Sequence, residues 1–227
     1  MLIYAKQPIY YLLQHHPERI RTLYLAKEIE KKEYAKLVKS GIELKRIPNE
    51  AAVKMARGAS HQGFLADVED ISLRDYREFL QLDFVVVLAG LTDVGNIGSI
   101  VRTGYALGVD AIVATGVSKL PMEAIARVST GALFDMPFAV TRNVYDLLND
   151  LKTSGFTIFG ADMGGEDIRR VDPPKKRALV LGSEGEGLPG RLRGKLDRVV
   201  SIEMKHAFDS LNVAVAGAIL IDRMRDE

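Results

Sequence analysis

Residues 84–108 read FVVVLAGLTDVGNIGSIVRTGYALG and set the pattern for the larger part of the chain. The segment opens with a continuous apolar run over 84–90, which is typical of a strand buried on both faces of a parallel sheet. The glycine-rich stretch after it predicts a tight loop and then a helix over 97–107. Strand, loop and helix in this order form the repeating unit of α/β proteins. On a helical wheel one face of the expected helix is small and apolar: Ile97, Ile100, Val101, Gly104 and Gly108.

The same alternation continues toward the C-terminus. Apolar runs that predict strands recur at 110–115, 137–140, 156–161, 177–182 and 198–204, and helical patterns occupy 121–128, 143–155 and 210–226. We therefore expect a parallel sheet with helices on both faces over residues 83–227. Ligands of such sheets bind beyond the carboxyl ends of the strands, so the loops after the apolar runs are where chemistry is expected.

A smaller α/β unit precedes this sheet. Residues 1–68 contain expected strands at 22–26, 42–47 and 63–68, with helices over 27–41 and 48–58 between them. The acidic and weakly patterned stretch 69–82 is interpreted as a linker between the two units.

The composition is that of a folded globular protein, with 47% hydrophobic residues in a chain of 227. No run reaches the roughly 20 apolar residues of a membrane span, and the N-terminal stretch lacks the features of a signal peptide, so a cytoplasmic location is expected. The chain has no cysteine, and its 4 histidines lack metal-ligand spacing. We therefore expect neither a disulfide framework nor a metal site.

The net charge of +1 conceals an uneven distribution of charged residues. Residues 1–60 hold 12 Lys and Arg against 6 Asp and Glu, whereas 61–100 hold 2 against 7 and 101–227 hold 17 against 17. The basic N-terminal third is a candidate for contact with a polyanion, although the mixed charges of the helix at 27–41 alone favour an ordinary solvated surface. Further candidate contacts for a polyanion are Lys175, Lys176, Arg177, Arg191, Arg193 and Lys195.

Three loops place polar side chains among small residues. They are GLTDVGNIGSIVRT over 90–103, GSEGEGLPG over 182–190 and EMKHAFDSLN over 203–212. The first two lack the glycine spacing of a dinucleotide-binding loop or a P-loop. Taken alone, Arg102 is explained as a solvated side chain on the outer face of a core helix, and Asn96 and Ser210 as helix N-caps. Glu184 lies in a turn where it could equally orient a ligand or be merely exposed.

Taken together and in this order, the loops resemble the motifs of the SpoU, or TrmH-type, branch of the SPOUT superfamily of S-adenosylmethionine-dependent RNA ribose 2'-O-methyltransferases. The segment NIGSIVRT over 96–103 looks like the first motif of that family. LVLGSEGEGL over 179–188 looks like the second, and Ile202-x-Met204 with SLNV over 210–213 looks like the third. STGALFDMPF over 129–138 is also similar to a family segment.

The resemblance implies a fold, a cofactor and partners. Residues 83–227 would form a SPOUT catalytic domain with a deep trefoil knot, and the protein would be a homodimer that uses S-adenosylmethionine and acts on RNA. Residues 1–68 are similar to a small ribosomal-protein-like domain that binds the RNA substrate, and SHQGFLADV over 60–68 looks like its closing signature. The most similar group is the 23S rRNA guanosine-2'-O-methyltransferases. A tRNA methyltransferase and a non-catalytic RNA- or ribosome-binding protein of the same fold are the alternatives.

The resemblance also implies roles for single residues. The catalytic positions of the family fall on Asn96, Arg102, Glu184, Ser210 and Asn212, and its cofactor contacts fall on Gly182, Ile202 and Leu211. In the family, the arginine that matches Arg102 is proposed to accept the ribose proton. A guanidinium with a pKa above about 12 is a poor proton acceptor, so anchoring of a neighbouring phosphate is the other interpretation.

Three positions depart from the family pattern. Val94 and Glu203 stand where proline is common, and His206 stands where glycine is common. None of the three departures removes a catalytic side chain. They concern the shape of the third loop around the cofactor, and His206 is a candidate to reach the site.

Overall fold

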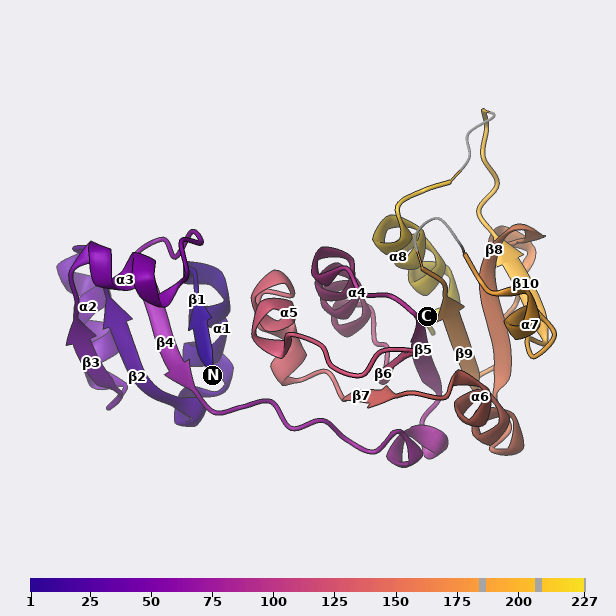
Figure 1. Cartoon of the computed structure of the whole chain (residues 1–227), viewed down its shortest axis with the longest axis horizontal. Helices are drawn as coiled ribbons and strands as arrows, with labels where there is room; N and C mark the ends of the chain where they lie inside the picture. The colour runs from indigo at the N-terminus through magenta and orange to yellow at the C-terminus, as the bar shows by residue number, and fades with distance from the viewer. Residues whose placement is uncertain (184–186, 207–209, 227) are drawn as a thin grey trace. The chain divides into compact units, whose positions relative to one another are not determined.

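The computed structural model describes residues 1–183, 187–206 and 210–226. These residues form two compact units, which are described separately below (Figure 1). The first unit comprises Met1–Ser72 and Pro121–Phe134, and the second comprises Leu73–Leu120 and Asp135–Glu227. The second unit therefore carries the larger sheet and all three of the loops singled out in the sequence.

The second unit is built around a six-stranded sheet in which all neighbouring strands are parallel. The strands are β5 (Phe84–Ala89), β6 (Ala111–Thr115), β7 (Phe138–Thr141), β8 (Thr157–Asp167), β9 (Arg177–Leu181) and β10 (Arg198–Ser201), in the order β10-β8-β9-β5-β6-β7. Strands β5, β6 and β9 are buried along their whole length. This confirms the parallel sheet predicted from the continuous apolar runs.

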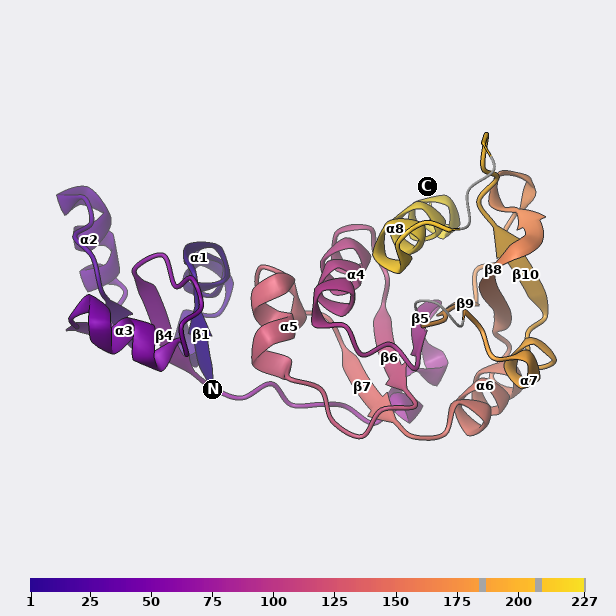
Figure 2. The same cartoon turned by 45° about the horizontal axis from the view of Figure 1, so that its top comes forward.

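Helices cover both faces of this sheet (Figure 2). On one face α4 (Val94–Ala106) packs against α8 (Val213–Met224). The other face carries α6 (Val144–Thr153), the short α7 (Gly190–Arg193) and the 3-10 helix η2 (Tyr76–Gln81). Since η2 buries Tyr76 and Phe79 in the core, part of the stretch interpreted as a linker contributes to this unit.

Helix α4 begins three residues earlier than the sequence pattern predicts. The N-cap is Asp93, whose Oδ1 accepts a hydrogen bond from the Asn96 backbone N–H at 2.7 Å. The interpretation of Asn96 as the cap was therefore wrong, because a better acceptor lies one turn before it. The predicted apolar face is confirmed at Ile97, Ile100, Val101 and Gly104, which are all buried, but not at Gly108, which is exposed and lies beyond the end of the helix.

Strand β8 leaves its neighbour β10 and rejoins it further on. Gly160 pairs with Val199, but the next residue of β10, Val200, pairs with Glu166. Residues 161–165 therefore bulge away from the ladder between these two pairs. At the return point Gly165 packs so closely that a Cβ there would lie 2.7 Å from the Val199 carbonyl carbon. The sequence pattern predicted a plain strand over 156–161 and missed this excursion.

The first unit has a four-stranded mixed sheet. Its strands are β1 (Leu2–Tyr4), β2 (Ile20–Leu25), β3 (Glu43–Arg46) and β4 (Phe64–Val68), in the order β1-β4-β2-β3, with only β2 and β3 parallel. Its helices are α1 (Lys6–His15), α2 (Lys31–Lys39), α3 (Asn49–Met55) and α5 (Met122–Val128), with short 3-10 turns at Pro17–Arg19 and Ala132–Phe134. The sequence pattern missed β1 and α1, because three residues are too few to show alternation and Pro8 interrupts the first turn of α1.

Candidate active site

A cleft of about 1060 Å³ lies in the second unit, where β8, β9 and β10 end at their carboxyl side. Its volume suits a ligand of cofactor size, and its place matches the general position of ligand sites in parallel sheets. The walls are formed by residues 161–164 of the β8 excursion, 181–183 and 187 after β9, 200–206 after β10, and 210–213 with Ala216 and Leu220 at the start of α8.

All three residues to which the sequence assigns cofactor contacts line this cleft: Gly182, Ile202 and Leu211. Gly182 is glycine for a steric reason. A Cβ on Gly182 would lie 2.3 Å from the Gly187 carbonyl oxygen, because the turn folds back on itself and Gly187 donates its N–H to the Ser183 carbonyl at 3.0 Å. Gly182 and Gly187 thus bring bare backbone to the cleft, and Ile202, Met204 and Leu211 line its other walls.

These walls fit S-adenosylmethionine. Backbone N–H and C=O groups can recognise an adenine edge and an amino acid moiety, and apolar side chains can cover the adenine ring. Among the described residues, the two cleft-lining carboxylates, Asp162 and Glu203, already pair with Arg193 and Arg169. No group of three His, Cys, Asp or Glu side chains within the described parts of the chain is arranged to hold a metal ion.

The first turn of α8 connects the cleft to α4. Asn212 is the N-cap of α8, and its Oδ1 accepts hydrogen bonds from the N–H groups of Ala214 at 2.9 Å and Val215 at 3.3 Å. Its Nδ2 donates to Oδ1 of the buried Asn96 at 2.9 Å. The structure therefore brings Asn96, Asn212 and the cleft-lining Ser210 together, but the capping role expected for Ser210 belongs to Asn212.

Helix α8 can approach the sheet because it is lined by small residues. A Cβ on Gly217 would lie 3.0 Å from Leu181 Cδ1 and 3.6 Å from Ile100 Cγ1. Helix α8 therefore packs closely against β9 and α4 within the chain itself. Val215, on the same helix, remains 49% exposed.

Arg102 is exposed on α4 and is not among the residues that line the cleft. Its guanidinium forms no hydrogen bond or ion pair with another residue of the described chain. A cation in this state is available to an external anion. Glu184, the remaining expected catalytic residue, lies outside the described residues.

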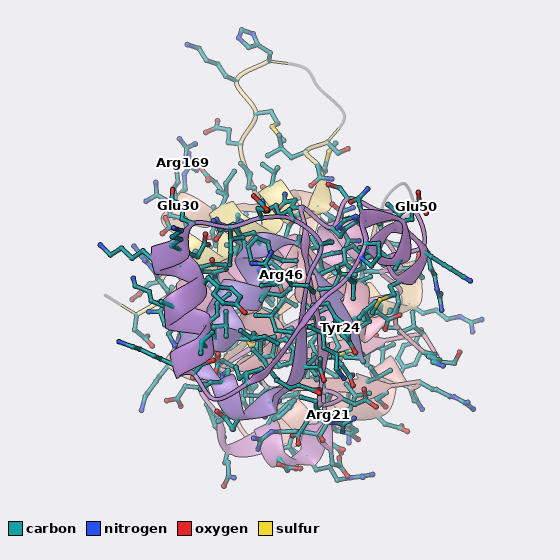
Figure 3. All side chains as sticks on the ribbon, turned by 90° about the vertical axis from the view of Figure 1, so that its left-hand side faces the viewer. Arg21, Tyr24, Glu30, Arg46, Glu50 and Arg169 are labelled. Atoms are coloured by element: carbon teal, nitrogen blue, oxygen red, sulfur yellow. The ribbon has the colours of Figure 1, made fainter. Side chains whose placement is uncertain are left out.

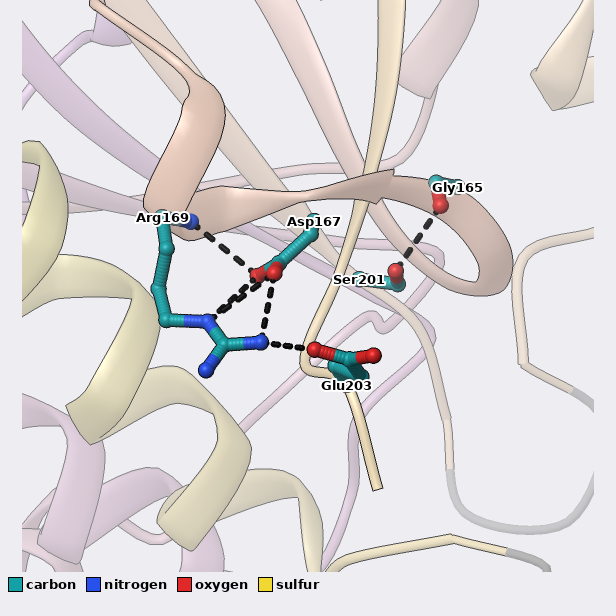
Figure 4. Close-up of polar contacts among 5 residues, drawn as sticks. All are labelled: Gly165, Asp167, Arg169, Ser201 and Glu203. Carbon is teal, nitrogen blue, oxygen red and sulfur yellow. Dashed lines mark hydrogen bonds and ion pairs between the residues drawn. The ribbon is translucent and has the colours of Figure 1, made fainter. Parts of the chain in front are cut away.

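The segment after β10 is attached to the β8 excursion by side chains that the sequence reasoning did not single out (Figure 4). Ser201 Oγ donates to the Gly165 carbonyl at 2.8 Å, and Arg169 of the 3-10 turn η4 (Ile168–Arg170) bonds both Asp167 and Glu203. The hydrogen bonds from Arg169 hold the pKa of Asp167 below its ordinary value, and Asp167 in turn raises the pKa of Arg169. The one sign of this contact in the sequence was Glu203, which stands where the family pattern commonly has proline.

Four of the cations proposed for RNA contact are already engaged. Arg177 is buried at 1% exposure, stacks on Phe84 and pairs with Asp226. Lys176 donates to two backbone carbonyls, Lys175 pairs with Asp83 at 3.1 Å, and Arg193 pairs with Asp162. The expectation that they bind RNA was therefore wrong for Arg177, and the other three would have to give up existing bonds.

Known proteins share both parts of this arrangement. Residues 83–222 match the SpoU rRNA Methylase family, and residues 2–73 match a family described as RNA 2'-O ribose methyltransferase substrate binding. The chain belongs to the SpoU rRNA methylase family. As a SpoU methylase with both parts, it is an RNA 2'-O-ribose methyltransferase.

Two of the following three relatives of this SpoU methylase cover nearly its whole length. A 23S rRNA (guanosine-2'-O-)-methyltransferase RlmB of Bordetella pertussis is 32% identical over 220 residues, which are 92% of this chain and 90% of the relative. The crystal structure of the SpoU methyltransferase AviRb from Streptomyces viridochromogenes, in complex with AdoMet, is 26% identical with a TM-score of 0.78, covering 98% of this chain and 88% of that one. An A. aeolicus TrmH/SpoU tRNA modifying enzyme is 27% identical with a TM-score of 0.56, covering 65% of this chain and 77% of that one.

The described residues include no helix of the length and apolarity that crossing a membrane requires.

Proposed function

We propose that this SpoU methylase transfers a methyl group from S-adenosylmethionine to the ribose 2'-hydroxyl of a guanosine in 23S rRNA. The observation that supports this substrate is the similarity to the Bordetella RlmB, which extends over 92% of the chain and includes the N-terminal part. A relative that shared only the catalytic part would say little about the RNA, because the substrate-binding part would be missing from the comparison.

S-adenosylmethionine would be held in the cleft by the backbone of the turn at Gly182 and by the side chains of Ile202 and Leu211. When bound, it supplies an electrophilic methyl group on a sulfonium. The remaining work falls to the protein, which must align the ribose oxygen with that methyl group and provide for the loss of the hydroxyl proton.

Arg102 is proposed as the anchor of the phosphate next to the target ribose. It is exposed and unengaged within the described residues, and a planar guanidinium binds a phosphate through two parallel hydrogen bonds. The Asn96–Asn212 hydrogen bond would fix the start of α8, so that Ser210 and Asn212 meet the ribose in a constant geometry. Glu184 is proposed to orient Arg102 on the family pattern alone.

The N-terminal residues 1–68 are proposed to bind the rRNA, with 69–82 joining them to the methyltransferase domain at 83–227. The matching family is described as substrate binding, and the exposed cations of the first unit offer phosphate contacts. Figure 3 labels two of them, Arg21 on β2 and Arg46 on β3. We also propose that the catalytic domain contains a deep trefoil knot and that the protein forms a homodimer. Val215 on α8 is half-exposed and is a candidate contact between the two copies.

Mapping 2'-O-methylated nucleotides in total RNA tests the substrate. A strain that lacks this protein should lose one or a few 2'-O-methylguanosines in 23S rRNA and regain them with the wild-type gene. Loss confined to tRNA would favour the second candidate, a tRNA methyltransferase. That candidate is supported by the A. aeolicus enzyme, which resembles this chain over 65% of its length.

A further inference from the structure

The wall of the cleft that follows β10 has little backbone support. Strand β10 ends at Ser201, and the next residues, Ile202, Glu203 and Met204, line the cleft outside any strand ladder. Within the described parts of the chain, two side-chain links hold this wall in place. One is the hydrogen bond of Ser201 to Gly165, and the other is the ion pair between Arg169 and Glu203.

Arg169 is well placed to act as the fixed end of the second link. Its Nε and Nη2 bond Asp167 Oδ2 at 2.9 and 2.7 Å, and its own backbone N–H bonds Asp167 Oδ1 at 3.1 Å. Asp167 is only 13% exposed in its side chain and caps the turn η4. The guanidinium is therefore locked to the end of β8, and its Nη2 still reaches Glu203 across the gap (Figure 4).

Glu203 lies between the cofactor-lining Ile202 and Met204, at the position where the third motif commonly carries proline. A proline restricts φ covalently and needs no partner, whereas glutamate leaves the backbone free to rotate. In this chain the ion pair of the Glu203 carboxylate with Arg169 restricts the segment around Glu203 through a side chain and not through the backbone. The restraint is electrostatic, since Arg169 is 54% and Glu203 61% exposed, and so it is open to screening by salt.

We propose that Arg169 and Glu203 are positioning residues, whose ion pair holds the segment 201–204 against β8 in the shape that binds S-adenosylmethionine. This inference rests on the proposed use of the cleft for that cofactor. Arg169 does not line the cleft and would act through Glu203, which does. In this chain the affinity for the cofactor then depends on an ion pair, and therefore on ionic strength, through a contact remote from the reacting atoms.

Calorimetric titration of the full-length protein with S-adenosylhomocysteine tests the pair without relying on turnover. We expect Glu203→Gln and Arg169→Gln each to weaken binding about two- to fivefold, the range for an exposed ion pair. The double variant should bind no more weakly than the worse single variant, because both changes remove one interaction. Arg169→Lys should give an intermediate loss, since lysine cannot bond Asp167 and Glu203 together in the same fork.

A matched control lies on β8 and β10, the two strands that precede Arg169 and Glu203 in the chain. Glu166 pairs with Arg198 at 2.6 Å, and neither residue lines the cleft. Glu166→Gln should leave the affinity within about 1.5-fold of wild type, although it also removes one exposed ion pair. Raising the salt from about 50 to 500 mM should weaken binding by the wild type toward the value of Glu203→Gln, and should change that variant little.

Amide hydrogen exchange over residues 201–206 provides a second readout that does not need the ligand. Exchange should be faster in Arg169→Gln and Glu203→Gln and unchanged in Glu166→Gln. Unchanged affinity and unchanged exchange in the first two variants would overturn the inference, as would fully additive losses in the double variant. If the wild type bound no ligand at all, the proposed function would fail, and the exchange measurement would still decide whether the pair holds the segment.

Discussion

At the scale of single residues, the site depends on one position that has no room for a side chain and on one exposed side chain that has no partner in the described part of the chain. Gly182 is surrounded so closely by the backbone of Gly187 and Leu188 that no Cβ fits, and this makes the turn after β9 a backbone surface. Arg102 is the opposite case, an exposed cation that has no partner in the described part of the chain. The two residues give the most direct tests of cofactor binding and of RNA anchoring.

Gly182→Ala should abolish measurable binding of S-adenosylhomocysteine and destabilise the fold by about 1–3 kcal/mol, because overpacking forces the turn apart. The control is Gly190→Ala at the start of α7, where a Cβ would meet nothing within 4 Å. That change should leave binding intact and alter stability by less than about 1 kcal/mol. Calorimetry and urea unfolding measure both effects, and a Gly182→Ala protein that binds normally would remove the turn from the cofactor site.

Arg102→Ala should lower kcat/KM on rRNA about 100-fold, because a misplaced ribose is no longer aligned for attack. If the residue anchors a phosphate, the affinity for RNA should fall as well, while the affinity for S-adenosylhomocysteine should stay unchanged. Arg102→Lys should recover little activity, since lysine lacks the fork. Near-full turnover with lysine would contradict both roles, and collapsed turnover at unchanged RNA affinity would favour the proton acceptor over the anchor.

At the scale of elements, the site is a junction of α4, α8 and the ends of β8, β9 and β10. Asn212 is the residue that ties two of these together, since it caps α8 and bonds Asn96 on α4. Arg169 ties two others, since it links the end of β8 to the segment after β10. Small shifts at either junction would change the cleft without altering the core.

Substitutions of Asn212 separate its structural role from its place in the site. Asn212→Ala should destabilise the protein by about 1 kcal/mol, the usual cost of a lost N-cap. Asn212→Asp should be more stable than Asn212→Ala, because a carboxylate also caps a helix N-terminus. Activity should fall in both variants, since neither can donate to Asn96. Unfolding curves and methylation rates give the two readouts, and full activity in Asn212→Asp would show that the bond to Asn96 is dispensable.

The Asp167–Arg169 contact predicts a dependence of stability on pH. Because the hydrogen bonds from Arg169 lower the pKa of Asp167 in the folded state, the ionised carboxylate stabilises the fold. That stabilisation is present above the unfolded pKa of about 4 and is lost as the pH falls through the lower folded value. Asp167→Asn keeps the cap acceptor but not the charge. It should therefore be less stable than wild type at pH 7, and the difference should shrink as the pH falls through the lowered pKa of Asp167, which urea unfolding across the acid range can measure. A constant difference would contradict the ionic contribution.

The strongest patterns in the sequence were sufficient to predict much of the fold of the second unit. The apolar runs predicted β5, β6 and β9, and the helical wheel predicted the buried face of α4. The pattern could not show the excursion of β8, because a bulge depends on pairing with β10, which lies more than 30 residues away along the chain. It assigned the cap of α4 to Asn96 because local sequence offers both Asn96 and Asp93 as acceptors, and only the backbone geometry selects Asp93.

At the scale of the whole molecule, the chain combines a part that matches a substrate-binding family with a part that matches the SpoU methylases. For the methylase part, the sequence motifs indicated a family, whereas the periodicity of apolar residues indicated only a parallel α/β sheet. The cleft-lining positions of Gly182, Ile202 and Leu211 agree with the cofactor contacts that those motifs assign. The positive charge of the first 60 residues, 12 cations against 6 anions, agrees with a polyanionic substrate.

The most direct test of this account is methyl transfer by the purified full-length protein from radiolabelled S-adenosylmethionine to 23S rRNA taken from a strain that lacks it. Digestion of the product to nucleosides should recover the label in 2'-O-methylguanosine, and Arg102→Ala should incorporate about 100-fold less. Label in a methylated base, or no incorporation into this RNA while tRNA is labelled, would contradict the proposed reaction or its substrate.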